Sequence, residues 1–231
     1  MLGIVVELIV SWLLLRYVER TDLSVLGIVP SKKRVENLVF GIIASAVTCA
    51  IYYLALGYLT GGNWKINAGF SFQSFLTGSW WSLKSVLFEE LIFRGALLYI
   101  LIRRLGLTAG CFISAVCFGI YHWFSYNVFG DIFQMVMILV ITGIAGVMFA
   151  FSFGLTKSLY LPIGLHYGWN LISAMVFSSG PLGEQLLILE GAVKVGGLLS
   201  AVLTIFQLVA LPLILIWYLR KPWKERRGSS S

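Results

Sequence analysis

The chain has 231 residues, of which 59% are hydrophobic and only 12% are charged, and its formal net charge is +7. Soluble domains typically carry about 25% charged residues, so this composition excludes an ordinary soluble domain and favours a helical membrane protein. The apolar runs are continuous instead of alternating, which argues against a β-barrel.

The basic residues flank apolar runs, at Lys32–Arg34, at Arg103–Arg104 and in the tail from Arg220 to Arg227. This placement is typical of the positive-inside rule, under which cytoplasmic loops collect lysine and arginine. We therefore interpret the excess charge as a sign of membrane topology. It predicts a cytoplasmic C-terminus, contact with a lipid bilayer and no nucleic-acid partner.

The apolar runs predict an all-α fold, a polytopic transmembrane helical bundle in one integral-membrane domain over residues 1–231. A spanning helix needs about 20 apolar residues. The expected helices run from about Leu2 to Tyr17, Leu38 to Thr60, Leu83 to Ile102, Thr108 to Trp123, Ile132 to Phe153 and Ser158 to Phe177. Ser71–Ser82 is expected to be an interfacial lead-in to the third helix, because tryptophans favour the headgroup level. Leu186–Leu219 is too long for one untilted span and can hold either one helix or a shorter helix plus a full one, so seven or eight spans are expected.

The third expected helix carries adjacent glutamates, Glu89 and Glu90, followed by Arg94. Glu90 and Arg94 are four residues apart, so they share a helix face and can pair. Glu89 has no such partner, which suits a group that takes and returns a proton. A buried ion-pair network that only locks helix packing is the structural alternative.

The fourth expected helix ends with Phe118 and His122 on one face. Taken alone, a histidine beside Trp123 near a helix end is more often an interfacial residue than a functional one. In the sixth, Gly164 and Gly168 form a face of small residues suited to close packing. His166 and Asn170 occupy nearly the opposite face, either as functional groups or as a polar clasp between helices.

Together, the candidate catalytic residues are Glu89, Glu90, His122, His166 and Asn170, in a core of residues 83–177. Ionisable side chains inside apolar helices usually face a bundle interior or a water-filled cavity. This set can polarise a water, accept its proton and stabilise an oxyanion. The HExxH, GxSxG and P-loop motifs are absent. The residues therefore indicate hydrolysis by an activated water, with or without a metal.

The order Glu89-Glu90-xxx-Arg94, Phe118-xxx-His122 and His166-xxx-Asn170 resembles the CPBP family. That family comprises the CAAX-processing proteases, including type II CAAX prenyl endopeptidases, and the bacteriocin-immunity (Abi) proteins. The resemblance covers about 80 residues, Glu89 to Asn170.

The resemblance implies an intramembrane endopeptidase in a prokaryotic cell membrane that cuts membrane-associated peptides or proteins, prenylated CAAX tails and peptide precursors among them. It implies that Glu89 and His122 activate water. Glu90, Arg94 and Phe118 would complete and orient the site, and His166 and Asn170 would stabilise the oxyanion or bind metal.

Two alternatives follow from the same residues. Glu89, His122 and His166 can hold zinc with an open position, so a zinc-dependent hydrolase is one interpretation. A non-enzymatic immunity factor or small transporter, which uses these groups as a relay or clasp, is the other.

Overall fold

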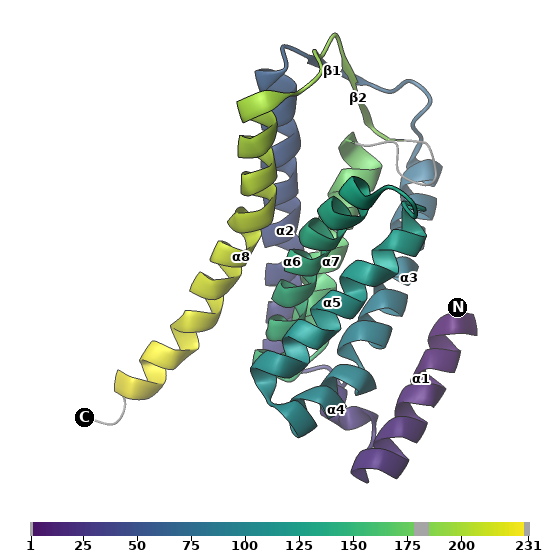
Figure 1. The fold of residues 1–231 in the computed structure, drawn as a ribbon, viewed down its shortest axis with the longest axis vertical. Helices are drawn as coiled ribbons and strands as arrows, with labels where there is room; N and C mark the ends of the chain where they lie inside the picture. Colours follow the sequence, from purple (N-terminus) through teal and green to yellow (C-terminus); the bar gives the residue numbers. More distant parts are fainter. Residues whose placement is uncertain (1, 178–184, 229–231) are drawn as a thin grey trace.

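The computed structural model describes residues 2–177 and 185–228, and their backbone is almost entirely helical (Figure 1). The predicted all-α class is therefore confirmed. The elements are α1 (Leu2–Leu14), a π-helical turn (Leu15–Glu19), a 3₁₀ turn (Leu23–Leu26), α2 (Lys32–Leu59), β1 (Asn63–Ile66), α3 (Phe72–Arg94), α4 (Ala96–Leu105), α5 (Leu107–Ser125), α6 (Ile132–Thr156), α7 (Tyr160–Ile172), a second π-helical turn (Ser173–Phe177), β2 (Leu187–Glu190) and α8 (Gly197–Gly228).

Within the described ranges, four helices are long and apolar enough to cross a membrane: α2, α5, α6 and the Gly197–Arg220 part of α8. Their outward faces are apolar. On α2 a stripe of large apolar side chains, each about half exposed, faces outward, as expected for lipid contact: Val39, Ile43, Val47, Ile51 and Leu54. The first and seventh helices have only 13 residues each. The structure therefore supports a helical membrane protein, and the larger count of seven or eight spans stays a prediction.

The predicted boundaries of the third helix are wrong at both ends. One continuous helix, α3, includes the expected lead-in, because Ser71 caps its first turn by accepting a hydrogen bond from the Ser74 backbone N–H at 3.0 Å. The helix then stops at Arg94, and Gly95 breaks the chain direction before α4. A Cβ atom on Gly95 would collide with the Leu91 carbonyl oxygen, so this break requires glycine.

Of the two alternatives for Leu186–Leu219, a shorter helix before the full one is not what the structure shows. Leu187–Glu190 forms strand β2, which pairs antiparallel with β1 and places Trp64 opposite Leu189. Exposure alternates from residue to residue along this segment, which is typical of a strand. Four residues are also too few for a stable helix. The remainder forms the single long helix α8.

The other expected helices are confirmed with shifted ends. The second begins at Lys32 instead of Leu38, because the Ser31 side chain caps it. The fourth expected helix, which is α5, extends to Ser125, past the expected end at Trp123. α7 ends at Ile172, and a π-helical turn continues it to Phe177.

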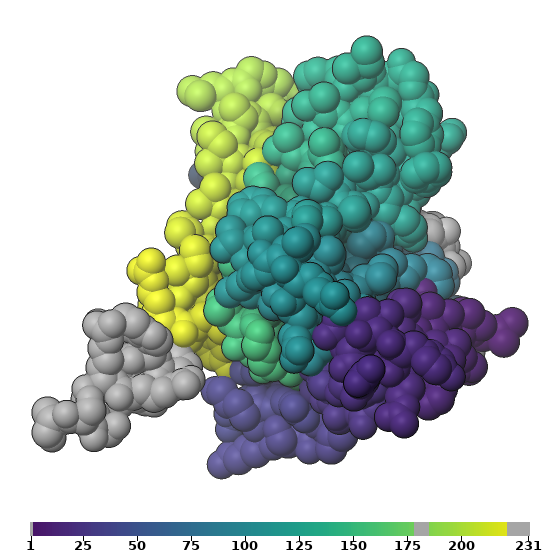
Figure 2. All heavy atoms as spheres, turned by 60° about the horizontal axis from the view of Figure 1, so that its bottom comes forward, coloured from purple at the N-terminus to yellow at the C-terminus, as the bar shows by residue number. Residues whose placement is uncertain are grey.

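The long helices form a bundle in which α2 and α7 pack along each other, as do α5 and α6. Helices α1 and α8 lie on opposite flanks of this centre, and the two views in Figures 1 and 2 agree on this. The strands β1 and β2 lie at one end of the bundle. At the other end, Glu19 pairs with Arg103 and Arg104, and the Leu159 N–H bonds to the Leu26 carbonyl at 3.1 Å.

The α2–α7 contact is a contact between backbones. A Cβ atom added to Gly164 or Gly168 would collide with the backbone of α2 at Leu38 or Ile42. Ser45 strengthens the contact, since its hydroxyl also lies within hydrogen-bond distance of the Gly164 carbonyl of α7, at 3.4 Å. The predicted small-residue face therefore packs within the bundle, and the opposite face of α7 is left for His166 and Asn170.

Candidate active site

A fully buried ion pair lies at the base of the site. The side chains of Glu90 and Arg94 are both 0% exposed, and Arg94 Nη1 donates to Glu90 Oε1 at 3.1 Å. The second guanidinium nitrogen of Arg94 donates to the Gly146 carbonyl of α6 at 3.3 Å. The guanidinium also lies 4.1 Å from the centroid of the Phe118 ring. The pairing predicted from the four-residue spacing is confirmed.

His166 is bonded to this pair across the α3–α7 interface. Its Nδ1 lies 2.8 Å from Glu90 Oε1. That oxygen already accepts a hydrogen bond from Arg94, and as a carboxylate oxygen it accepts from His166 too, so His166 Nδ1 carries the proton. In the neutral imidazole the lone pair is then on Nε2. Glu90 thus fixes both the orientation and the tautomer of His166.

His122 is fixed in the same way by its own helix. Its Nδ1 lies 2.8 Å from the Phe118 carbonyl oxygen, one turn earlier on α5. A carbonyl oxygen accepts only, so this nitrogen is the donor and Nε2 again carries the lone pair. The Phe118 ring, 2% exposed, packs edge-on against the imidazole with ring centroids 4.5 Å apart.

Both free imidazole nitrogens face the same carboxylate oxygen. Glu89 Oε2 lies 3.9 Å from His122 Nε2 and 3.8 Å from His166 Nε2. These separations are too long for hydrogen bonds. Among the described residues Glu89 Oε2 is buried without a hydrogen-bond partner, while Ser85 contacts the other oxygen at 3.5 Å. Three hydrogen-bond acceptors, Glu89 Oε2 and the Nε2 atoms of the two histidines, therefore surround one space, and none of them donates to another.

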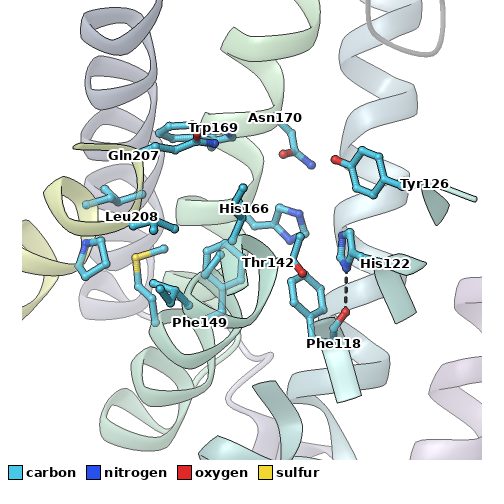
Figure 3. A pocket seen from close by; sticks show the side chains of 16 residues that line it. Phe118, His122, Tyr126, Thr142, Phe149, His166, Trp169, Asn170, Gln207 and Leu208 are labelled. Carbon is cyan, nitrogen blue, oxygen red and sulfur yellow. Dashed lines mark hydrogen bonds between the residues drawn. The ribbon is translucent and has the colours of Figure 1, made fainter. Parts of the chain in front are cut away.

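The two histidines of this cluster border a cavity of about 170 Å³ between α5, α6, α7 and α8. Figure 3 shows His122, His166 and Asn170 around the same space. Asn170 contributes its amide one turn beyond His166, as the sequence predicted. The structure adds Tyr126, which caps α5 and lines the cavity too. Tyr126 was not predicted from the sequence; its spacing of four residues from His122 is the signal that could have found it.

The predicted zinc ligands have suitable chemistry but are not gathered as a metal centre. Across residues 2–177 and 185–228, no group of three or more His, Cys, Asp or Glu side chains lies close enough together to hold a metal ion.

The structure thus brings together all the predicted site residues: Glu89, Glu90, Arg94, Phe118, His122, His166 and Asn170. The buried pair, the two oriented imidazoles and the free carboxylate come from three helices that differ in their packing partners. Such a fold and site define a class: helical membrane proteins with a buried glutamate–histidine cluster beside a cavity.

A family model described as Type II CAAX prenyl endopeptidase Rce1-like matches residues 70–172, which include every motif residue. The match confirms the resemblance to the CAAX protease family over the part of the chain that forms the site. No curated protein and no solved structure matches the chain at a significant level. The family points to a protease in a membrane.

Proposed function

We propose that the chain is an intramembrane endopeptidase in which Glu89 and His122 activate the attacking water. The observation that carries the proposal is the position of Glu89 Oε2, 3.9 Å and 3.8 Å from the two imidazole nitrogens whose lone pairs face it. A water about 2.8 Å from each of two such acceptors would donate one hydrogen to each, at an angle of about 90°. Such a site orients and polarises a single water.

The reaction follows from these groups. The water oxygen attacks the carbonyl carbon of the scissile peptide bond while a water proton passes to Glu89. The π electron pair of the carbonyl moves to its oxygen, which becomes the oxyanion of the tetrahedral intermediate. Glu89 then returns the proton to the departing amine as the C–N bond breaks, and the carboxylate is restored.

The other residues hold this arrangement. Arg94 pairs with Glu90, and Glu90 orients His166. The Phe118 carbonyl orients His122. Asn170 borders the cavity where the oxyanion would form, and a preorganised donor at that position is often the largest contribution to such catalysis.

The substrate we propose is a membrane-associated peptide or protein. Two features support it. The cavity lies inside a bundle with an apolar outer face. The matching family model is described as a type II CAAX prenyl endopeptidase. The basic residues beside Glu19, together with the end of α8, lie at one end of the bundle (Figure 1). This placement supports a cytoplasmic C-terminus under the positive-inside rule.

The decisive test is proteolysis by the purified full-length protein in lipid nanodiscs, against a panel of prenylated and unlipidated peptides. We expect the wild type to cut at least one peptide. Glu89→Gln, which removes the base without changing its size, should lower kcat about 10³-fold. The matched control is Glu36→Gln, at an exposed glutamate paired with Lys33. It should cut at the wild-type rate.

Equal cleavage by the wild type, Glu89→Gln and His122→Ala would contradict the proposal. If no peptide is cut but sealed vesicles show solute flux that Glu89→Gln abolishes, the residues act as a relay in a transporter. A zinc-dependent hydrolase would instead contain stoichiometric zinc and lose activity with a chelator. We expect activity to persist in the presence of a chelator.

A further inference from the structure

Tyr126 is a polar residue that lines the cavity and has no part in the proposed activation of water. Tyr126 follows the last residue of α5 and stands one turn beyond His122, with ring centroids 6.0 Å apart and the rings inclined by 29°. In Figure 3 its hydroxyl and the Asn170 amide point toward one another, next to the two imidazoles. Both side chains line the same cavity.

The backbone at Tyr126 is held by a closed set of hydrogen bonds. Its N–H bonds to the His122 carbonyl at 3.0 Å, the Asn127 N–H to Phe124 at 3.2 Å and the Val128 N–H to Trp123 at 3.2 Å. With Asn127 in the left-handed region at φ 50°, this is a Schellman motif. Val128 is 6% exposed and so anchors the turn in the protein.

A further bond fixes the same helix end to its neighbour. The indole Nε1 of Trp123 donates to the Met135 carbonyl of α6 at 2.8 Å. The backbone at Tyr126 is therefore set by the fold before any substrate arrives, while its side chain is 62% exposed. A donor carried on a fixed backbone needs little reorganisation during the reaction, which is what an oxyanion site requires.

The phenol also stays protonated. Desolvation in the cavity, and after it the Glu89 carboxylate, raise the pKa of the Tyr126 hydroxyl above its ordinary value. The hydroxyl is thus a hydrogen-bond donor at neutral pH. It has no role as a base, which leaves proton transfer to Glu89.

We propose that Tyr126 is a catalytic residue that forms an oxyanion hole together with Asn170. This inference rests on the proposed endopeptidase function. The Tyr126 hydroxyl and the Asn170 amide would donate to the carbonyl oxygen as it becomes the oxyanion, and neither group gives up its proton. The water oxygen, its proton and the leaving amine are handled by Glu89 as above.

The test is Tyr126→Phe, which removes one oxygen atom and leaves the ring. With the peptide that the wild type cuts, kcat should fall about 100-fold while KM changes little, as when one oxyanion donor is lost. The matched control is Tyr121→Phe on the same helix, where the ring packs against Phe93 with centroids 5.3 Å apart. The control should retain the wild-type kcat.

A binding measurement separates catalysis from folding. A phosphinic analogue of the cut peptide, which carries a tetrahedral anionic oxygen, should bind Tyr126→Phe about 100-fold more weakly than wild type. The corresponding methyleneamine peptide lacks that oxygen and should bind both proteins equally.

Two results would overturn the assignment. If Tyr126→Phe keeps kcat within threefold while Glu89→Gln is inactive, the role of Tyr126 is wrong and the proposed function stands. If the wild type cuts no peptide, the proposed function and this inference fall together.

Discussion

The buried pair of Glu90 and Arg94 makes a sharp prediction about stability. Arg94→Met keeps an apolar side chain of similar length but removes the charge that compensates Glu90. An unpaired buried charge costs about 3–5 kcal/mol. Arg94 also loses its bond to the Gly146 carbonyl and its contact with the Phe118 ring. The free energy of unfolding should therefore fall by at least about 3 kcal/mol.

The double variant Glu90→Gln/Arg94→Met decides whether charge is the cause. It leaves no buried charge in the pair, and the amide oxygen introduced by Glu90→Gln can still accept from His166. Only the losses at Gly146 and Phe118 remain, about 1–2 kcal/mol. The double variant should thus be more stable than Arg94→Met alone, with a coupling of at least about 2 kcal/mol in the double-mutant cycle.

The assay is unfolding in mixed micelles, followed by tryptophan fluorescence. Lys65→Met is the matched control, because Lys65 pairs with Glu190 at only 2.6 Å while the two side chains are 64% and 53% exposed. An exposed pair contributes less than about 1 kcal/mol. Equal losses for Lys65→Met and Arg94→Met, or additivity within about 0.5 kcal/mol in the cycle, would refute the reasoning.

Two further predictions concern packing and the end of the bundle where Glu19 lies. Gly168→Ala places a Cβ against the α2 backbone and should lower the free energy of unfolding by about 1–3 kcal/mol in the same assay. Gly143→Ala is the control, because a Cβ there meets nothing within 4 Å, and it should leave the stability unchanged. Equal losses for the two variants would contradict the close contact between α2 and α7. Glu19 is 6% exposed between two arginines that are 60% exposed, so Glu19→Gln should cost about 1 kcal/mol or less, and the loss should shrink in 1 M salt. A loss that does not depend on salt would point to packing instead of charge.

Local spacing predicted those parts of the site that lie on one helix. The four-residue separations of Glu90 from Arg94 and of Gly164 from Gly168 each fix a shared face, whatever surrounds the helix. Both predictions are confirmed, by the ion pair and by the α2–α7 contact. The membrane class followed from composition for a similar reason, since it depends on no long-range contact.

The parts that failed depend on contacts between distant segments. β2 forms because Leu187–Glu190 finds β1 at Asn63–Ile66, more than 120 positions earlier in the chain, and no local pattern reports that partner. The break at Gly95 separates α3 from α4 within Leu83–Ile102, a segment of the length expected for one spanning helix. Tyr126 was missed because it looks like an interfacial aromatic residue until the cavity is seen.

The different surroundings of the adjacent glutamates follow from the geometry of one helix. Glu89 and Glu90 are about 100° apart around α3, so they cannot face the same partners. Glu90 points to Arg94 and His166 and is bonded to both, whereas Glu89 points to the two imidazole lone pairs and is bonded to neither. Because Glu90 sets the tautomer of His166, it also determines that His166 presents an acceptor to the space beside Glu89. The Glu90 carboxylate therefore leaves only hydrogen-bond acceptors around the space beside Glu89. A water molecule is the smallest group that can donate two hydrogen bonds to them.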